Sequence, residues 1–305
     1  MDRAGGWNFV ANVFDGALYF LALTLISQQA VLPVFVRNIG GGNVALGMIP
    51  VVWTFGFNFP QVVIAPHAQM LRRKKPLLLQ TAIGQRIPWL LLGIFALFLI
   101  RHVGTDLALA LFFILFALAA IGGSLNLPVW FDLIAKLTPV GARGRLFAAR
   151  LVGGAVLGLG GGALVTHTLE AYGWPENFAF LFFGAFAIMM VSYLFLVSLR
   201  GESDDIPPRQ RADWRVLLSV PRRLGMRGNY LRYLVADALL SASAMANAFF
   251  AIYALKKFAL PDWYAGTFTL AMMASTILGG GIFGVVADRY GHRINMIMFA
   301  LLSVL

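Results

Sequence analysis

The sequence predicts an all-α polytopic membrane protein, and three observations lead to this fold class. The chain is 60% hydrophobic and only 12% charged, with a mean hydropathy of +0.79, whereas a soluble domain carries about 25% charged residues. Long stretches lack Asp, Glu, Lys and Arg, and most reach the roughly 20 residues that a helix needs to cross a bilayer. The basic residues cluster in alternate gaps between these stretches, as the positive-inside rule describes.

Eight membrane spans follow from the apolar stretches, and a ninth begins near Asn295. The first is too long for a signal-peptide core and lacks a small-residue cleavage site, so we interpret it as a membrane helix. The ninth rises only about 18 Å before Leu305, which is short of a bilayer core of about 30 Å, so we expect the chain to stop inside this helix. The eight spans are 12–36, 44–69, 77–100, 107–134, 146–168, 177–199, 231–255 and 264–287.

The basic residues predict which side of the membrane each loop occupies. They gather at the N-terminus and in the segments near residues 72, 143, 215 and 291, and Arg150 is counted with the second of these segments. Only Arg37, Arg101, Lys256 and Lys257 fall in the other gaps. Because one miscounted helix would exchange the sides of every later loop, the bias supports the whole count. We therefore expect an integral protein of the plasma or inner membrane with a cytoplasmic N-terminus. The net charge of +11 needs no nucleic-acid partner.

A long polar segment divides the chain after the sixth span. We predict an N-terminal six-helix half over 1–199, a cytoplasmic linker over 200–230 and part of a second half over 231–305. The linker places Trp214, Leu217 and Leu218 among arginines, which is typical either of an amphipathic helix in the membrane interface or of a solvated linker. Asp15 and Asp237 recur early in spans one and seven, which suggests two parallel repeats.

The most specific motif runs from Gly284 to Arg293, after span eight on the predicted cytoplasmic side. Its sequence, GVVADRYGHR, resembles the G-x-x-x-D-R-x-G-[RH]-[RK] loop motif of the major facilitator superfamily. The six spans, the long loop and the second set of spans are similar to that family's layout. The resemblance implies a transporter with two six-helix halves, of which this chain holds one half and two to three helices of the other. In the first half only the basic end of the motif, Lys74-Lys75, matches.

The resemblance also implies a role for this loop as a latch between the cytoplasmic ends of the two halves in the outward-facing state. Asp288 would then dock on the start of span five, near Gly144 and Arg145. The alternative is that the arginines of the motif simply obey the positive-inside rule. The residues assigned to the latch are Gly284, Asp288, Arg289, Gly291 and Arg293.

Small residues line one face of span five and of span eight. Gly154, Gly158 and Gly162 recur every four residues in span five, and Gly280 precedes Gly284 by four residues in span eight. Small residues at this spacing let helix backbones approach closely in lipid. The resemblance implies that these spans face each other across the two halves, so the glycines provide either a surface that slides or a static contact. Span five lacks the proline of the drug–proton antiporter pattern, because Leu159 occupies that position.

Ionisable residues inside a span are costly and are therefore candidates for function. Arg86 lies in span three, where it binds an anionic group, pairs with Asp132 or reaches back toward the cytoplasm. Asp132 has Arg72 and Arg73 as alternative partners. Asp15 and Asp237 lie one to two turns inside spans one and seven, where they either carry a coupling proton or ion or, as we prefer, act as helix-end charges.

Polar residues deeper in the spans predict a substrate cavity. The resemblance implies that spans one, four and seven line it, and each amide has the alternative of bridging neighbouring helices. The cavity candidates are Gln28, Gln29, Arg86, Asn126, Trp130 and Asn247.

The function predicted from these features is a secondary transporter for a small solute that works by alternating access, active as a monomer when full length. A transport-inactive sensor or assembly protein on the same fold is the main alternative, because the first-half motif has decayed, and a channel is less favoured. No catalytic cluster predicts an enzyme. The absence of cysteine and of a His-Glu cluster predicts no metal site, and no motif predicts a cofactor.

Overall fold

The computed structural model describes residues 3–69, 71, 73–201 and 246–290, with isolated positions between 232 and 301. The regular elements in this part of the chain are all helical, which confirms the predicted fold class. They are α1 (Arg3–Leu25), α2 (Val31–Ile39), α3 (Asn43–Gln69), α4 (Lys75–Ile94), the π-helical turn η1 (Phe95–Leu99), α5 (Thr105–Leu137), α6 (Val140–Ala171), α7 (Glu176–Val197), α10 (Asn247–Lys257) and α11 (Tyr264–Tyr290).

Among the described residues, six helical stretches are long and apolar enough to cross a membrane. Five of them match the predicted spans two to six, and the first overlaps only part of the first predicted span. α11 covers the predicted eighth span, and α10 covers the end of the seventh. The start of the seventh span, nearly all of the linker and the ninth span lie outside the described residues. The six stretches are Gly5–Leu25, Asn43–Ala65, Lys75–Leu99, Thr105–Leu137, Val140–Ala171 and Glu176–Val197.

The first predicted span is wrong as a single helix, because the chain breaks between α1 and α2. α1 ends at Leu25 and α2 begins at Val31. Pro33 accounts for the break, since its ring has no N–H and crowds the carbonyl four residues earlier, which belongs to Gln29. In α2 the same proline occupies the first turn, where backbone N–H groups have no partner within the helix. Short apolar α2 therefore forms a separate element rather than the end of a long rod.

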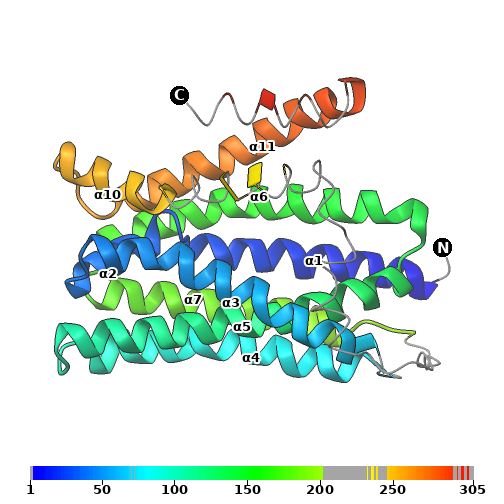
Figure 1. Ribbon diagram of the computed structural model, residues 1–305, viewed down its shortest axis with the longest axis horizontal. Helices are drawn as coiled ribbons and strands as arrows, with labels where there is room; N and C mark the ends of the chain where they lie inside the picture. Colours follow the sequence, from blue (N-terminus) through cyan, green and yellow to red (C-terminus); the bar gives the residue numbers. More distant parts are fainter. Residues whose placement is uncertain are drawn as a thin grey trace.

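The helices of the first half run side by side along the long axis of the molecule (Figure 1). α1 packs against α6 and α7, α4 packs against α5 and α7, and α3 packs against α5. At one end α2 inserts Phe35 into an aromatic cluster with Phe112, Phe178 and Phe182, whose ring centroids lie 5.0 to 5.6 Å from that of Phe35. Offset aromatic pairs at such distances stabilise a core beyond simple burial.

A polar layer separates two hydrophobic clusters of the first half. On α1, Ala22 belongs to the cluster that contains the aromatic residues, and Ala11 belongs to a smaller cluster toward the N-terminus. Asp15 lies between them on the same helix, and it is only 4% exposed. Arg86 of α4 is 2% exposed. Two oppositely charged groups are therefore buried between the clusters, and buried ionisable residues in a membrane span are candidates for function.

α11 contacts α6 along only part of its length. A β-carbon placed on Gly266 of α11 would lie 2.3 Å from the backbone nitrogen of Thr166, and one placed on Gly162 of α6 would lie 3.0 Å from the backbone nitrogen of Leu270. The two backbones thus approach each other closely here. Figure 1 shows α11 beside α6 at the end near α10 and rising away from it toward its own C-terminal end.

The predicted glycine faces agree only in part with this contact. Gly158 and Gly162 of α6 do face α11, where Met273 and Leu270 fill the space beside them. Gly154 faces Phe20 of α1 instead, and a β-carbon on Gly280 would meet no described atom within 4 Å. The expectation that two small-residue stripes oppose each other is therefore wrong, because large side chains of α11 pack into the glycine groove of α6.

Candidate functional site

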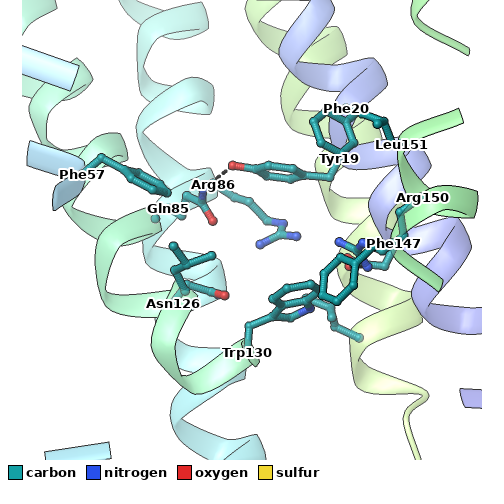
Figure 2. Close-up of a pocket in the computed structure, with 14 residues that line it drawn as sticks. Tyr19, Phe20, Phe57, Gln85, Arg86, Asn126, Trp130, Phe147, Arg150 and Leu151 are labelled. Atoms are coloured by element: carbon teal, nitrogen blue, oxygen red, sulfur yellow. Dashed lines mark hydrogen bonds and ion pairs between the residues drawn. The ribbon is translucent and has the colours of Figure 1, made fainter. Parts of the chain in front are cut away.

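A cavity of about 420 Å³ opens in the first half beside the polar layer. Its volume is within the range of about 300–1,000 Å³ that is usual for small-molecule sites. Six helices contribute to its wall: α1, α3, α4, α5, α6 and α7. Figure 2 shows the aromatic side chains around it and the guanidinium of Arg86 pointing into its middle. The lining residues are Asp15, Tyr19, Phe20, Phe57, Gln85, Arg86, Gly123, Asn126, Leu127, Trp130, Phe147, Arg150, Leu151 and Leu196.

A chain of hydrogen bonds connects the charged residues of the cavity. Arg86 Nη2 donates to Ser192 Oγ at 3.2 Å, and Ser192 Oγ donates to Asp15 Oδ1 at 2.8 Å. The other carboxylate oxygen of Asp15 accepts from Arg150 Nη1 at 3.0 Å. One carboxylate therefore serves two guanidinium groups, one directly and one through a hydroxyl. Such charge-assisted bonds are stronger than neutral ones, and they hold four helices in register.

Two backbone carbonyl groups accept from two further donors of Arg86. Its Nε donates to Met189 O and its Nη1 donates to Ala82 O, both at 2.8 Å. The guanidinium also lies over the ring of Tyr193, 5.5 Å from the centroid. Arg86 is thus held by backbone and aromatic groups as well as by the network, and it does not extend to the N-terminal end of α4.

Arg150 reaches the site through a slot that Gly16 leaves open. A β-carbon on Gly16 would lie 2.4 Å from Nε of Arg150 and 2.5 Å from its central guanidinium carbon. Nη1 of Arg150 donates to Asn12 O at 2.5 Å. The guanidinium also stacks on Trp130, 4.5 Å from the ring centroid, a favourable cation–π distance. Glycine at position 16 is therefore a geometric requirement for the Asp15–Arg150 pair.

The α4–α5 contact places Gln85 and Arg86 at the cavity. A β-carbon on Gly122 of α5 would lie 2.6 Å from the backbone nitrogen of Gln85, so α4 approaches closely only because residue 122 is glycine. The Gln85 amide donates to the hydroxyl of Tyr19 on α1. This bond spans the cavity wall between α4 and α1, as Figure 2 shows.

The predicted Arg86–Asp132 pair is wrong, because Lys74 takes the carboxylate of Asp132. Lys74 is the residue that precedes α4 and is only 4% exposed. Its bond to Asp132 places the start of α4 beside the C-terminal part of α5. Arg86 lies three turns further along α4, beyond the reach of that pair. Sequence separation alone did not distinguish these basic residues.

The preferred interpretation of Asp15 as a helix-end charge is also wrong. α1 begins at Arg3, which puts Asp15 more than three turns inside the helix, whereas the macrodipole acts within the first turn. Its carboxylate bonds to side chains of α6 and α7 instead. Asp237 lies outside the described residues.

The structure brings together half of the predicted cavity residues. Arg86, Asn126 and Trp130 line the cavity with Asp15. Asn126 Nδ2 donates to Leu78 O at a long 3.4 Å, and Trp130 Nε1 is buried without a hydrogen-bond partner in the described part of the chain.

The remaining predicted cavity residues lie elsewhere. Gln28 and Gln29 fall in the break between α1 and α2. Gln29 and Asn247 line a second, mostly apolar cavity of about 470 Å³ with residues of α10 and α11. The prediction placed both glutamines on a continuous helix. They lie outside it because the first span is interrupted before Pro33.

The motif residues after span eight are partly described. α11 continues to Tyr290, so the backbone of Gly284, Asp288 and Arg289 is helical rather than in a loop. Gly291 and Arg293 lie outside the described residues. At the start of α6, a β-carbon on Gly144 would meet no described atom within 4 Å. The latch therefore stays a prediction.

Three residues of the network were missed by the sequence analysis. Arg150 was assigned to a cytoplasmic loop because it follows Arg143 and Arg145, yet it lies within α6. Its position inside the predicted span 146–168 was the signal that could have found it. Ser192 and Gly16 gave no signal, because serine and glycine are ordinary residues in membrane helices.

The described residues contain no group of three His, Asp or Glu side chains that could hold a metal ion.

The family model described as Major Facilitator Superfamily matches residues 9–305. No curated protein sequence matches the chain. Among solved structures, a bacterial homolog of the human lysosomal transporter Spinster, in an inward-facing and unoccupied conformation, aligns with a TM-score of 0.67 and 14% identity over 96% of this chain and 64% of that chain.

The nucleoside transporter NupG, in a mutant form, aligns with a TM-score of 0.66 and 13% identity over 95% of this chain and 69% of that chain. At these identities both structures are evidence for the fold alone. The chain spans less than two thirds of the length of the Spinster homolog.

Proposed function

The chain belongs to the Major Facilitator Superfamily, and from that premise we propose that it is part of a secondary transporter that moves a small solute by alternating access. The observation that carries this proposal is the cavity with its buried Arg86–Ser192–Asp15–Arg150 network. Ionisable groups at this depth in a membrane protein are costly and mark the paths of substrates or ions. The protein is integral to a membrane, and we place its N-terminus in the cytoplasm of a cell with the plasma or inner membrane as its location.

The contact between the two halves supports a rocking motion. Near α2, Arg37 Nη2 and Asn38 Nδ2 donate to the two carboxylate oxygens of Asp262, at 2.7 and 2.6 Å. These bonds join the first half to the segment between α10 and α11. Together with the close α6–α11 approach at Gly266, they close one end of the molecule. The predicted sidedness makes this the outer end, which is the arrangement of an inward-open state.

The remaining roles belong to the same proposal. Asp288 would latch the opposite, cytoplasmic end when the halves rock, and the glycines of α6 would let α11 shift against it. Asp15, and Asp237 in the second half, would carry a coupling proton or ion. We propose a monomeric permease without enzymatic activity, with residues 200–230 as the linker between the halves.

Alternating access can be tested with a thiol reporter in the cavity, because the chain contains no cysteine. Asn126→Cys in the full-length protein should react with a membrane-impermeant maleimide mainly from the cytoplasmic side of oriented vesicles. When a substitution or ligand shifts the conformation, alternating access requires labelling to rise from one side as it falls from the other. Labelling that rises from both sides together, as in a channel, would reject the proposal. Phe98→Cys, on the exposed surface of η1, provides a reporter outside the cavity.

Sidedness needs its own measurement, for which α6 provides matched positions. β-Carbons on Gly141, before the first turn is complete, and on Gly173, just after the helix, would meet no described atom within 4 Å. Gly141→Cys should therefore be labelled from the cytoplasmic side and Gly173→Cys from the outside, without disturbing the fold. Labelling of both from one side would contradict the predicted topology.

A further inference from the structure

The charges around the cavity do not balance. Asp15, Arg86 and Arg150 are the charged residues in its described wall. The single carboxylate bonds directly to Arg150 and through Ser192 to Arg86. One positive charge in this layer therefore has no counterion among the described residues.

Burial makes this imbalance costly. Arg86 is 2% exposed, and the side chain of Arg150 is 11% exposed. Taking a charge out of water is unfavourable unless an opposite charge compensates it. In a membrane the cost is greater, because the surrounding lipid does not solvate the charge as water would. An anion that enters the cavity would supply the missing counterion and would be bound more tightly for that reason.

Unused donors are present to bind such an anion. A guanidinium offers five N–H groups. Arg86 uses three of them on Met189, Ala82 and Ser192, and among the described residues Arg150 donates to protein groups only through Nη1. Trp130 Nε1 adds a buried donor that has no partner among the described residues. A carboxylate, which is flat and accepts two parallel N–H bonds, is the anionic group that guanidinium recognises best.

The aromatic part of the cavity wall indicates what the uncharged part of a bound solute is like. Phe20, Phe57, Trp130 and Phe147 line the cavity, and Figure 2 shows these rings around the central space into which Arg86 points. Aromatic rings pack favourably against flat apolar groups. The polar end of a bound solute would lie at the arginines and its apolar end among the rings.

We propose that the cavity binds a small organic monoanion, a carboxylate carried on an aromatic or apolar body. The assignment rests on the proposed transport function only in treating the cavity as the solute site. Arg86 and Arg150 bind the carboxylate of the solute. Asp15 neutralises one of the two arginines, so the site has a net charge of one positive unit before the solute binds.

The test is the binding of matched probes to the full-length protein in nanodiscs of phosphatidylcholine, a lipid without net charge. Isothermal calorimetry compares benzoate and 1-naphthoate with their neutral amides and with benzylamine, at one pH and ionic strength. We expect at least one acid to bind tenfold more tightly than its amide and benzylamine to show no binding. If neither acid binds more tightly than its amide, or if benzylamine binds best, the assignment is overturned.

Variants separate the charge from the fold. Arg150→Gln should weaken binding of the acid at least tenfold, whereas Asp15→Asn should strengthen it, because it leaves two positive charges without a carboxylate. The double variant Asp15→Asn with Arg150→Gln leaves Arg86 as the one positive charge without a counterion, so it should keep a preference for the acid over the amide although it lacks the donors of Arg150. Arg143→Gln is the control, because Arg143 bonds to Thr138 O and Ala135 O outside the cavity. Equal effects of Arg143→Gln and Arg150→Gln would contradict the assignment.

These measurements fail separately from those on transport. If the acid binds but labelling of the thiol at position 126 changes in the same direction from both sides, the substrate class stands and alternating access falls. If labelling is one-sided but the amides bind as well as the acids, transport stands and the anion assignment falls.

Discussion

Asp15 is the carboxylate that joins the two halves of the hydrogen-bond network in the polar layer. Its two oxygens accept from Arg150 and Ser192, and it is 4% exposed. Removing one partner of a buried ion pair is far more damaging than replacing the whole pair, because the surviving charge stays buried without compensation. The carboxylate is thus the residue on which the stability of the layer depends.

Asp15→Asn should accordingly lower the free energy of unfolding by about 3 kcal/mol. Ser192→Ala, which removes a hydroxyl bonded to both Arg86 and Asp15, should cost about 2 kcal/mol. Thermal unfolding of the purified full-length variants measures both. Asp106→Asn, at the exposed first turn of α5, is the matched control and should change stability by less than about 1 kcal/mol. Equal effects at positions 15 and 106 would show that the buried pair does not stabilise the fold.

Sequence reasoning found Arg86 and missed Arg150 for a physical reason. Arg86 is isolated among apolar residues, so its charge is conspicuous. Arg150 follows a run of arginines at a helix start, where positive charge is expected on topological grounds. What distinguishes Arg150 is that its guanidinium occupies the place of the missing side chain at Gly16, and such a fit depends on how two helices pack. The partners of buried charges are therefore less predictable than their existence.

At the scale of elements, the spans were predictable and their interruptions were not. Apolar length alone located α3 to α7, because each must satisfy its own backbone groups in lipid. Pro33 lies within an apolar stretch, so the separation of α2 from α1 became visible only with the backbone. The glycines of α6 were expected to meet small residues, but Leu270 and Met273 of α11 fill the groove instead. Small residues predict a close approach without predicting the partner.

Helix α11 provides a direct comparison between a tight and an open glycine. Gly266→Ala would force a β-carbon against the backbone of Thr166, and overpacking of this kind costs about 1–3 kcal/mol. Gly280→Ala meets no described neighbour and should be neutral, or stabilising by up to about 1 kcal/mol through helix propensity. Thermal unfolding of the two variants measures the difference. Should Gly280→Ala prove the more harmful of the two, the described α6–α11 contact would be wrong.

At the scale of the whole molecule, the two ends of the interface between the halves should act against each other. Asp262 joins the halves near α2, and we propose that Asp288 joins them at the opposite end. A substitution that weakens one end shifts the population toward the state that the other end stabilises. The two carboxylates therefore form a natural pair for one experiment.

Asp262→Asn should raise labelling of an Asn126→Cys reporter from the outside and lower it from the cytoplasm. Asp288→Asn should produce the reverse, because it loosens the cytoplasmic end. Rates of maleimide labelling in oriented vesicles give both directions, and a severalfold change is expected if each carboxylate contributes about 1 kcal/mol to its end. Changes of the same sign in both variants would argue against opposed gates.

The place of the missing side chain at Gly16 is taken by Arg150, which limits the replacements that α1 can accept there. A larger residue would have to displace this guanidinium from Asp15, so a saturation library selected for folded protein should be enriched in glycine at position 16. Gly6, on the same helix with no described atom near its missing β-carbon, should tolerate a broad range of replacements. Tolerance to substitution is thus expected to differ between Gly6 and Gly16, although the amino-acid sequence gives no sign of the difference.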